Sequence, residues 1–254
     1  MEEGQHQLQR NLNRPTDRGG HGGHEVHHQD HGEEAVLREA VIGDLVHADE
    51  VFQDAKAAVQ GADLIILCTP VCCIGDVAAQ IAPHLANGAI LSDVGSVKAS
   101  VVAAVQPHLS DKVHFIPAHP VAGTEYSGPD AGFSTLFVDR WCILTPPEGS
   151  VETAVTKLQQ FWTEVGSNVE VMTPAHHDLV LAITSHVPHL IAYNIVGTAA
   201  DLEEVTQSEV IKFSAGGFRD FTRIAASDPT MWRDIFLNNK EAVLEMLGRF
   251  NEDL

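Results

Sequence analysis

Residues 62–68, with the sequence ADLIILC, form a continuous apolar run of strand length. Such a run is typical of a strand that is buried on both faces of a parallel sheet. A helical pattern over 74–85 follows, and Asn87-Gly88 then turns the chain into a second apolar run at 89–94. These residues predict two strands joined by a crossover helix.

The same alternation continues on both sides of this unit. The sequence patterns predict helices at 35–45, 54–60 and 98–108, and further strands at 113–116 and 141–144. Strands that alternate with helices at this spacing imply right-handed crossovers and helices on both faces of the sheet. We therefore expect an α/β fold with a doubly wound, Rossmann-like parallel sheet.

The pattern after Pro147 is helical and stays so to the end of the chain. Thr173 is placed to cap a helix, and Pro174 stands in its first turn, where the missing N–H costs nothing. This helix continues through HHDLVLAITSHVPHLIAYNIVGTAADL, which is apolar nearly all round and so predicts burial on several sides. A helix of that kind often packs against a second copy of itself, so we expect an all-helical dimerisation domain and a homodimer.

Three segments of the chain differ in composition. Residues 1–33 are polar, rich in His and Gly and without periodicity, which predicts a disordered tail. We expect the Rossmann-like domain at 34–147 and the helical domain at 148–254. The histidines of the tail can capture a divalent cation adventitiously, but they have no fixed geometry, so we expect no functional metal site.

The charge balance excludes several classes of partner. The 254 residues include 15 Lys and Arg against 35 Asp and Glu, a net charge of −20. Nucleic acid and anionic membrane surfaces both require a basic face. No apolar run reaches the roughly 18 residues that span a bilayer, and the N-terminus lacks the apolar core of a secretory signal. We expect a cytoplasmic protein that binds a small molecule or another protein.

The four cysteines lie in apolar stretches of sequence. Cys68, Cys72, Cys73 and Cys142 show none of the paired spacing that clamps zinc. We expect them to be small buried hydrophobic residues in a reducing compartment.

Polar residues follow three of the predicted strands. In an open parallel sheet, ligands bind outside the carboxyl ends of the strands. Thr69 and Pro70 follow the first strand, Asp93 and Ser96 the second, and His119 the third. His119 is placed to act as a base, with Ser96 close enough to orient its ring. The alternatives are a structural, half-buried imidazole for His119 and a helix N-cap for Ser96.

Two pairs of polar residues stand out in the helical part. His186 and His189 lie at i and i+3 on one predicted helix face, and no third metal ligand follows at a legible spacing. Arg219 and Arg223 lie at i and i+4, so they can share a face and bind a carboxylate or phosphate. The alternative for the arginines is salt bridging to the many acidic residues.

Several long motifs resemble those of the prephenate and arogenate dehydrogenase family. They are, in chain order, SDVGSVK at 92–98, PAHPVAGTEYSGPDAG at 117–132, HHDLVLAITSHVPHLIAYNIVGTA at 176–199 and SAGGFRDFTRIAASDPTMWRDIFLNNK at 214–240. The resemblance covers the chain from about residue 60 to its end. With RWCILTPP and ADLEEVTQSEV, the sequence is most similar to the monofunctional cyclohexadienyl dehydrogenases of bacteria.

This resemblance implies oxidative decarboxylation of prephenate or arogenate on the route to tyrosine, with hydride transfer to NAD or NADP. His119, with Ser96 orienting it, would accept the proton of the ring hydroxyl, and Arg223 would bind a substrate carboxylate in the helical domain. The residues that would complete the substrate pocket are Arg219, His186, His189, Thr124 and Glu125. Those that would line the nicotinamide half of the cofactor site are Thr69, Pro70, Asp93 and Ser96.

The N-terminus departs from the family pattern. A dinucleotide-binding domain should open with a strand, a G-x-G-x-x-G turn and a helix whose N-terminus receives the pyrophosphate. Here the early G-x-G is Gly20-His21-Gly22, and the third glycine position falls on Glu25, whose carboxylate would face the phosphates. We therefore expect the first βαβ unit to be missing or altered. Two functions stay open: an active dehydrogenase, and a catalytically impaired or truncated relative that acts only as a substrate-binding or dimerisation partner.

Overall fold

The computed structural model describes residues 49–123, 131–203 and 209–254. The chain divides into two compact units, of which one contains residues 54–190 and 227–254. The other contains residues 191–226 together with the chain up to residue 53. The tail predicted at 1–33 and the helix predicted at 35–45 lie outside the described residues.

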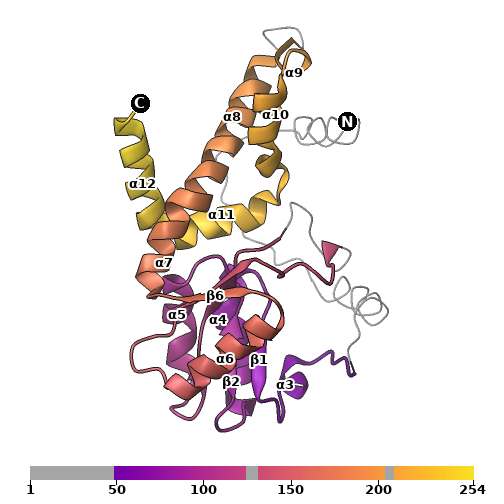
Figure 1. Ribbon diagram of the computed structural model, residues 1–254, viewed down its shortest axis with the longest axis vertical. Helices are drawn as coiled ribbons and strands as arrows, with labels where there is room; N and C mark the ends of the chain where they lie inside the picture. The colour runs from indigo at the N-terminus through magenta and orange to yellow at the C-terminus, as the bar shows by residue number, and fades with distance from the viewer. Residues whose placement is uncertain (1–48, 124–130, 204–208) are drawn as a thin grey trace, which may run out of the picture. The chain divides into compact units, whose positions relative to one another are not determined.

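Three parallel strands form the first sheet of the larger unit, in the order β1-β2-β3 (Figure 1). They are β1 (Leu64–Leu67), β2 (Ile90–Asp93) and β3 (His114–Phe115). Leu64 pairs with Ile90 and Leu67 with Asp93, so β1 and β2 end together at one edge of the sheet. The predicted parallel sheet is confirmed, and its carboxyl edge is the place where the predicted site residues emerge.

Alternation along the strands divides the core of this unit into two layers. Leu91 of β2 packs in one layer with Ile74 and Val101, which come from helices on one face of the sheet. Ile90, its neighbour, packs in the other layer with Leu158 from a helix on the opposite face. Within residues 49–117 the helices are α3 (Ala55–Ala58), α4 (Val71–Ile81), η1 (Ala82–His84), α5 (Ala99–Val105) and η2 (Gln106–His108).

A second sheet of three strands continues the unit, in the order β4-β5-β6. Its strands are β4 (Ala118–Pro120), β5 (Trp141–Leu144) and β6 (Asn168–Val171), and α6 (Glu152–Glu164) lies between β5 and β6. β5 runs antiparallel to β4 and parallel to β6. The prediction that the chain is helical throughout after Pro147 is therefore wrong at β6. Its four residues, NVEV, are mostly exposed and form no apolar run, and α6 and β6 extend the sheet layer beyond the boundary predicted at 147.

The long C-terminal helix begins where the sequence predicts. α7 (Pro174–Leu181) has Thr173 as its N-cap, and the Thr173 hydroxyl accepts a hydrogen bond from the His176 amide at 3.2 Å. A π-helical turn, η4 (Ala182–His186), leads into α8 (Val187–Glu203). The run Pro174–Leu202 is long and apolar enough to cross a membrane by length and composition alone, with 28% of its most apolar window buried. One such helix is weak evidence for a membrane span, because a helix that packs in a protein interface passes the same test.

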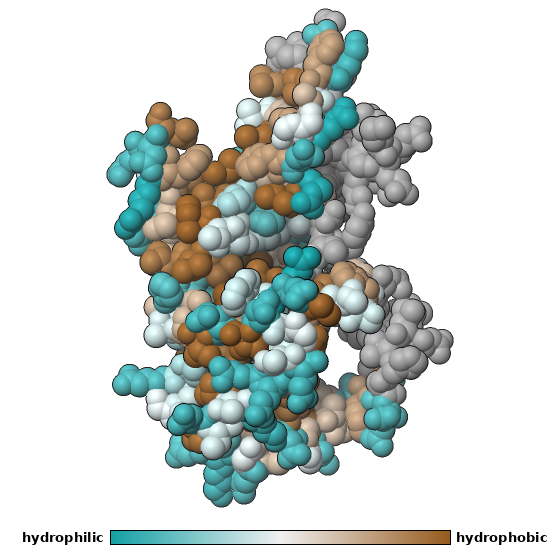
Figure 2. All heavy atoms as spheres, viewed as in Figure 1, coloured by the Kyte–Doolittle hydropathy of each residue, from teal (hydrophilic) through white to brown (hydrophobic). Residues whose placement is uncertain are grey.

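Two further helices complete the larger unit, α11 (Pro229–Asn238) and α12 (Lys240–Glu252), and α12 packs against α7 and η4. Large apolar side chains lie exposed on these elements: Leu179 at 38%, Ile183 at 46% and Leu244 at 56%. Figure 2 shows hydrophobic side chains gathered on the surface over this part of the chain. Within one chain, the burial on several sides predicted for the long helix is therefore incomplete.

From residue 191 on, the described part of the smaller unit is mainly helical. After α8 it contains α9 (Glu209–Lys212), α10 (Gly216–Thr222) and the 3-10 turn η5 (Arg223–Ala226). Thr222 is fully buried and its hydroxyl donates to the Phe218 carbonyl at 2.7 Å. Phe213, which is 68% exposed, gives this unit an uncovered apolar surface of its own.

The prediction of four buried cysteines is wrong for three of them. Cys142 is buried in β5, whereas Cys68, Cys72 and Cys73 are exposed. These three follow the carboxyl end of β1 or stand in the first turn of α4, where the apolar sequence reaches the open edge of the sheet.

Replacing Leu158 by Ala tests the second core layer. Leu158 of α6 is 1% exposed and packs against the sheet, so the substitution leaves a cavity that neighbouring side chains fill only in part. We expect Leu158→Ala to lower the free energy of unfolding by about 2–5 kcal/mol in urea titrations. Leu254→Ala, at a residue that is 89% exposed, should change it by less than about 0.5 kcal/mol. Equal losses in both variants would contradict the layer assignment.

Candidate active site

His119 lies in β4, directly beyond the carboxyl end of the parallel sheet, and is 8% exposed. Its Nδ1 is 2.8 Å from Nε2 of His177, and the two rings meet edge to face with centroids 5.1 Å apart. Burial holds the pKa of His119 well below its usual value, and His177, Lys98 and His186 lower it further. His119 is therefore neutral near pH 7, which is the form that a general base requires.

The carboxylate of Asp178 lies behind His177, in the first turns of α7. Its Oδ1 is 2.8 Å from Nδ1 of His177, a ring that is fully buried. The same carboxylate accepts hydrogen bonds from the amides of Lys98 at 2.8 Å and Ala99 at 2.9 Å, at the start of α5. It thereby satisfies amides that the helix itself leaves unpaired. Burial lowers the pKa of His177, and the bond to Asp178 opposes that shift.

A buried ion pair fixes the end of β2. The Lys98 Nζ donates to Asp93 Oδ2 and, at 2.7 Å, to the carbonyl of Ala118, with both charged side chains fully buried. Burial lowers the pKa of Lys98, and the charge of Asp93 acts in the opposite direction. The Gly95 amide also donates to Asp93 Oδ2, and a Cβ at Gly95 would lie 2.9 Å from that oxygen. Since the Lys98 side chain reaches the residue before His119, this pair ties β2 to the base.

The residues predicted for the nicotinamide side lie at the same edge. Thr69 and Pro70 come one residue after the end of β1, and Asp93 is the last residue of β2. Thr69 Oγ1 and Asp93 Oδ1 are buried and have no hydrogen-bond partner in the described part of the chain. Buried polar atoms are normally paired, so these two are available to hydroxyl or amide groups of a ligand. The edge therefore fits a polar cofactor at these residues.

Ser96 does not have the orienting role that the sequence suggested. The Nδ1 of His119 is paired with His177, and within residues 49–123 no hydrogen bond joins Ser96 to His119. Burial lowers the pKa of His186, and a hydrogen bond with the Ser96 backbone opposes that shift only in part. Neither is Ser96 the cap of α5, because Asp178 supplies that acceptor from another part of the chain.

His177, Asp178 and Lys98 are site residues that the sequence did not predict. One signal was present: the pair His177-Asp178 falls in the first turn of a helix whose start at Thr173 was recognised. Polar residues on an otherwise apolar helix need buried partners. The sequence could not show that those partners stand about 80 residues earlier, at the start of α5.

His186 and His189 both face Trp232, as their i, i+3 spacing predicts. His189 stacks on the Trp232 ring at 3.6 Å between centroids, and His186 meets it edge to face at 6.1 Å. His186 is fully buried, and its Nδ1 is 3.0 Å from the side-chain nitrogen of Asn239. The Nε2 of His186 is buried too and has no hydrogen-bond partner in the described part of the chain.

The remaining predicted substrate residues belong to the smaller unit or lie outside the described residues. Arg219 in α10 and Arg223 in η5 are both exposed, and they belong to the smaller unit. Their i, i+4 spacing on adjoining helical turns is compatible with one shared anion. Thr124 and Glu125 lie outside the described residues.

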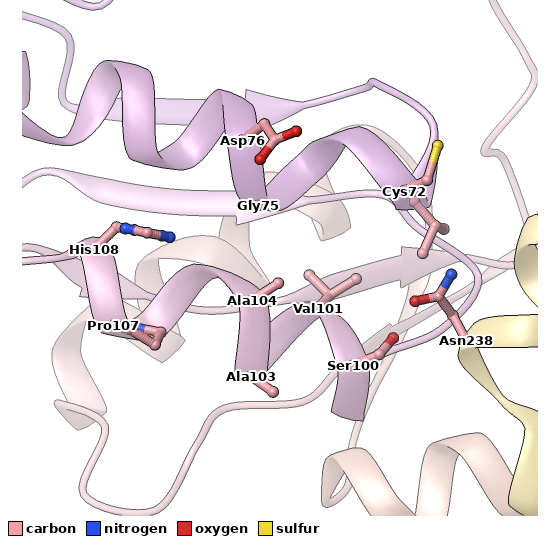
Figure 3. A pocket seen from close by; sticks show the side chains of 11 residues that line it. Cys72, Gly75, Asp76, Ser100, Val101, Ala103, Ala104, Pro107, His108 and Asn238 are labelled. Carbon is pink, nitrogen blue, oxygen red and sulfur yellow. The ribbon is translucent and has the colours of Figure 1, made fainter. Parts of the chain in front are cut away.

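A separate pocket opens between α4 and α5 (Figure 3). It has a volume of about 410 Å³, and Cys72, Asp76 and Asn238 are among the side chains at its wall. It is lined by neither His119 nor Asp93, so this pocket is distinct from the cluster at the strand ends. Over residues 49–123, 131–203 and 209–254, no group of three or more His, Cys, Asp or Glu side chains is arranged to hold a metal ion.

Comparison with known proteins assigns both parts of the chain. A family model described as the nucleotide-binding domain of prephenate dehydrogenase matches residues 20–171, and one described as its dimerisation domain matches residues 173–254. The first match begins in a stretch outside the described residues, so the predicted loss of the dinucleotide turn stays a prediction.

Individual relatives agree with these matches. The chain is 45% identical over 206 residues to the cyclohexadienyl dehydrogenase of Zymomonas mobilis, covering 81% of this chain and 70% of that protein. It is 35% identical to the prephenate dehydrogenase of Bacillus subtilis, covering 86% of this chain and 56% of that protein. The prephenate dehydrogenase of A. aeolicus, solved with hydroxyphenyl propionate and NAD+, matches with a TM-score of 0.79 at 31% identity, covering 98% of this chain and 83% of that chain.

The buried histidines make stability depend on pH. Burial lowers the pKa of His186 to about 4, below its usual 6.5. Between these pH values the ring of His186 is protonated in the unfolded chain and neutral in the folded chain. The free energy of unfolding therefore falls as the pH falls from about 6.5 to about 4. His186 contributes on the order of 3 kcal/mol to this fall. We expect His186→Gln to flatten this decline in urea titrations across the window. The exposed His176→Gln serves as control, and identical slopes in the two variants would contradict the assignment.

Proposed function

Because the chain belongs to the prephenate dehydrogenase family, we propose that it catalyses the oxidative decarboxylation of prephenate or arogenate, with hydride transfer to a nicotinamide dinucleotide. The observation that carries this proposal is a neutral, buried His119 at the carboxyl edge of a parallel sheet. The alternative of a catalytically impaired partner is not favoured. His119 and the buried His177 that contacts it are both present, and the relatives are named as dehydrogenases.

A bound nicotinamide ring supplies the hydride acceptor. Thr69, Pro70, Asp93 and Ser96 are the residues that would hold this half of the cofactor, and the buried, unpaired Thr69 Oγ1 supports that assignment. We favour NAD over NADP because the A. aeolicus structure holds NAD+. The residues that would discriminate the two at the adenine ribose precede β1 in folds of this kind.

His119 removes the proton that hydride transfer releases. As the C–H bond of the carbinol carbon breaks and its electron pair leaves as hydride, the hydroxyl proton passes to His119 and the C–O bond becomes a ketone. The ketone then receives the electron pair of the ring carbon–carboxylate bond, carbon dioxide leaves, and the ring becomes aromatic. The chain's own contribution is a neutral base held at a fixed position.

The substrate carboxylates require cationic partners. On a chain of net charge −20, a local pair of guanidinium groups is needed to hold an anion. We assign this role to Arg223, supported by Arg219, which is one helical turn away. The sequence motifs also assign His189, Thr124, Glu125 and the buried His186 to substrate binding.

A homodimer in the cytoplasm is the proposed working form. The dimerisation-domain match covers residues 173–254, and exposed apolar side chains on α7, η4 and α12 offer a face for a second copy. Burying such a face against an identical one removes it from water in both copies. Light scattering coupled to size exclusion measures the mass directly, and a monomer would count against this form.

Replacing His119 by Asn tests the proposed base. We expect His119→Asn to lower kcat by about 100-fold or more while KM changes little, since the amide cannot accept the proton but fills similar space. The assay follows absorbance of the reduced cofactor with prephenate or arogenate and either NAD+ or NADP+. The exposed His84→Asn should behave as the unmodified chain. An unchanged kcat in His119→Asn would remove His119 from the mechanism.

Replacing Arg223 by Ala tests the carboxylate site. We expect the KM for the substrate to rise by about 10-fold or more while kcat falls far less, because the guanidinium binds ground state and transition state alike. Arg140→Ala, at an exposed arginine near β5, is the matched control. A loss confined to kcat would argue against a role in binding the carboxylate.

A further inference from the structure

We propose that His177 and Asp178 are positioning residues for the proposed reaction: they fix the tautomer of His119 and take up the positive charge that His119 acquires. The proposal rests on the function assigned above and on a chain of two hydrogen bonds. These join His119 Nδ1 to His177 Nε2 and His177 Nδ1 to Asp178 Oδ1, each at 2.8 Å.

The direction of each hydrogen bond follows from the chemistry of the last group. A carboxylate only accepts, so Nδ1 of His177 carries a hydrogen and donates to Asp178. Burial lowers the pKa of His177, so the ring is neutral near pH 7 and its Nε2 bears a lone pair. That lone pair accepts from Nδ1–H of His119. The Nε2 of His119 is thereby left with a lone pair, and it is the nitrogen that can receive a proton from substrate.

The two hydrogen bonds also provide a position for the positive charge that His119 acquires when it takes the proton. When Nε2 of His119 takes the hydroxyl proton, the Nδ1 proton of His119 can shift to Nε2 of His177. His119 is then neutral again, with its hydrogen on Nε2, and His177 is an imidazolium paired with the Asp178 carboxylate. No proton is created or lost in this exchange. An imidazolium beside a carboxylate is far less costly in a buried site than an isolated one.

Hydrogen bonds hold the Asp178 carboxylate in its position beside His177. Both of its oxygens accept backbone amides at the start of α5, and the Asp178 carbonyl accepts from the Asn239 side chain at 2.8 Å. The other charged groups that act on the two rings are Lys98 and Asp93 from the β2 edge and His186 from η4. Lys98 is already paired with Asp93, so Asp178 is the anion that faces His177 directly.

Substitutions at His177 separate orientation from charge uptake. In His177→Leu the acceptor for His119 is gone, and we expect kcat to fall by about 100-fold with little change in KM. In His177→Gln the side-chain oxygen can accept from His119 but cannot be protonated, so kcat should lie between the Leu variant and the unmodified chain. The neighbouring, exposed His176→Gln is the control and should retain full kcat. Full kcat in His177→Leu, or equal losses in the Leu and Gln variants, would overturn the proposal.

A measurement without substrate or cofactor tests the tautomers directly. Nitrogen-15 NMR of the full chain with labelled histidine, assigned through the single variants, should show both His119 and His177 protonated at Nδ1 near pH 7. Protonation of His119 at Nε2 would overturn the proposal. Because this readout needs no turnover, it decides the tautomers even if no dehydrogenase activity is found. A lack of activity would contradict the proposed function, whereas the NMR result alone decides whether His119 and His177 have the proposed tautomers.

Discussion

The carboxylate of Asp178 accepts hydrogen bonds from two backbone amides at the start of α5 and from the ring of His177. These donors come from segments about 80 residues apart in the chain, and no other side chain in the described residues accepts from those two amides. A buried carboxylate without such donors would be strongly destabilising. The requirement to satisfy it therefore fixes α7 against the carboxyl edge of the sheet, and with it the ring that contacts His119.

The buried ion pair of Lys98 and Asp93 extends the same constraint across the sheet. A buried pair of charges contributes little net stability, since desolvation offsets most of the attraction between them. Its geometric effect is clearer, because the Lys98 Nζ bridges the end of β2 and the Ala118 carbonyl next to the base. Desolvation of the same region keeps His119 neutral. Position and protonation state of the base thus follow from one dry, hydrogen-bonded cluster.

Much of the fold could be predicted from sequence, because β1 and β2 are apolar runs with no other reasonable structure and Thr173-Pro174 is a strong helix start. β6 could not, because it is short and mostly exposed, and its residues show no apolar run; within the described chain it pairs with β5 alone. The predicted ends of the strands were enough to place His119 at the carboxyl edge of the sheet. They could not predict its partner, because the identity of the contacting ring depends on how α7 packs, and this led to Ser96 in place of His177.

In the proposed reaction, hydride leaves the carbinol carbon of the substrate while His119 removes the hydroxyl proton. The most direct test uses prephenate carrying deuterium at that carbon, with the purified chain and NAD+, and follows the fate of the label by NMR. We expect one deuterium at the nicotinamide C4 for each molecule of carbon dioxide released, and a far slower transfer in His119→Asn. Carbon dioxide release without transfer of deuterium, or no reaction by the folded chain with prephenate, arogenate and either cofactor, would contradict it.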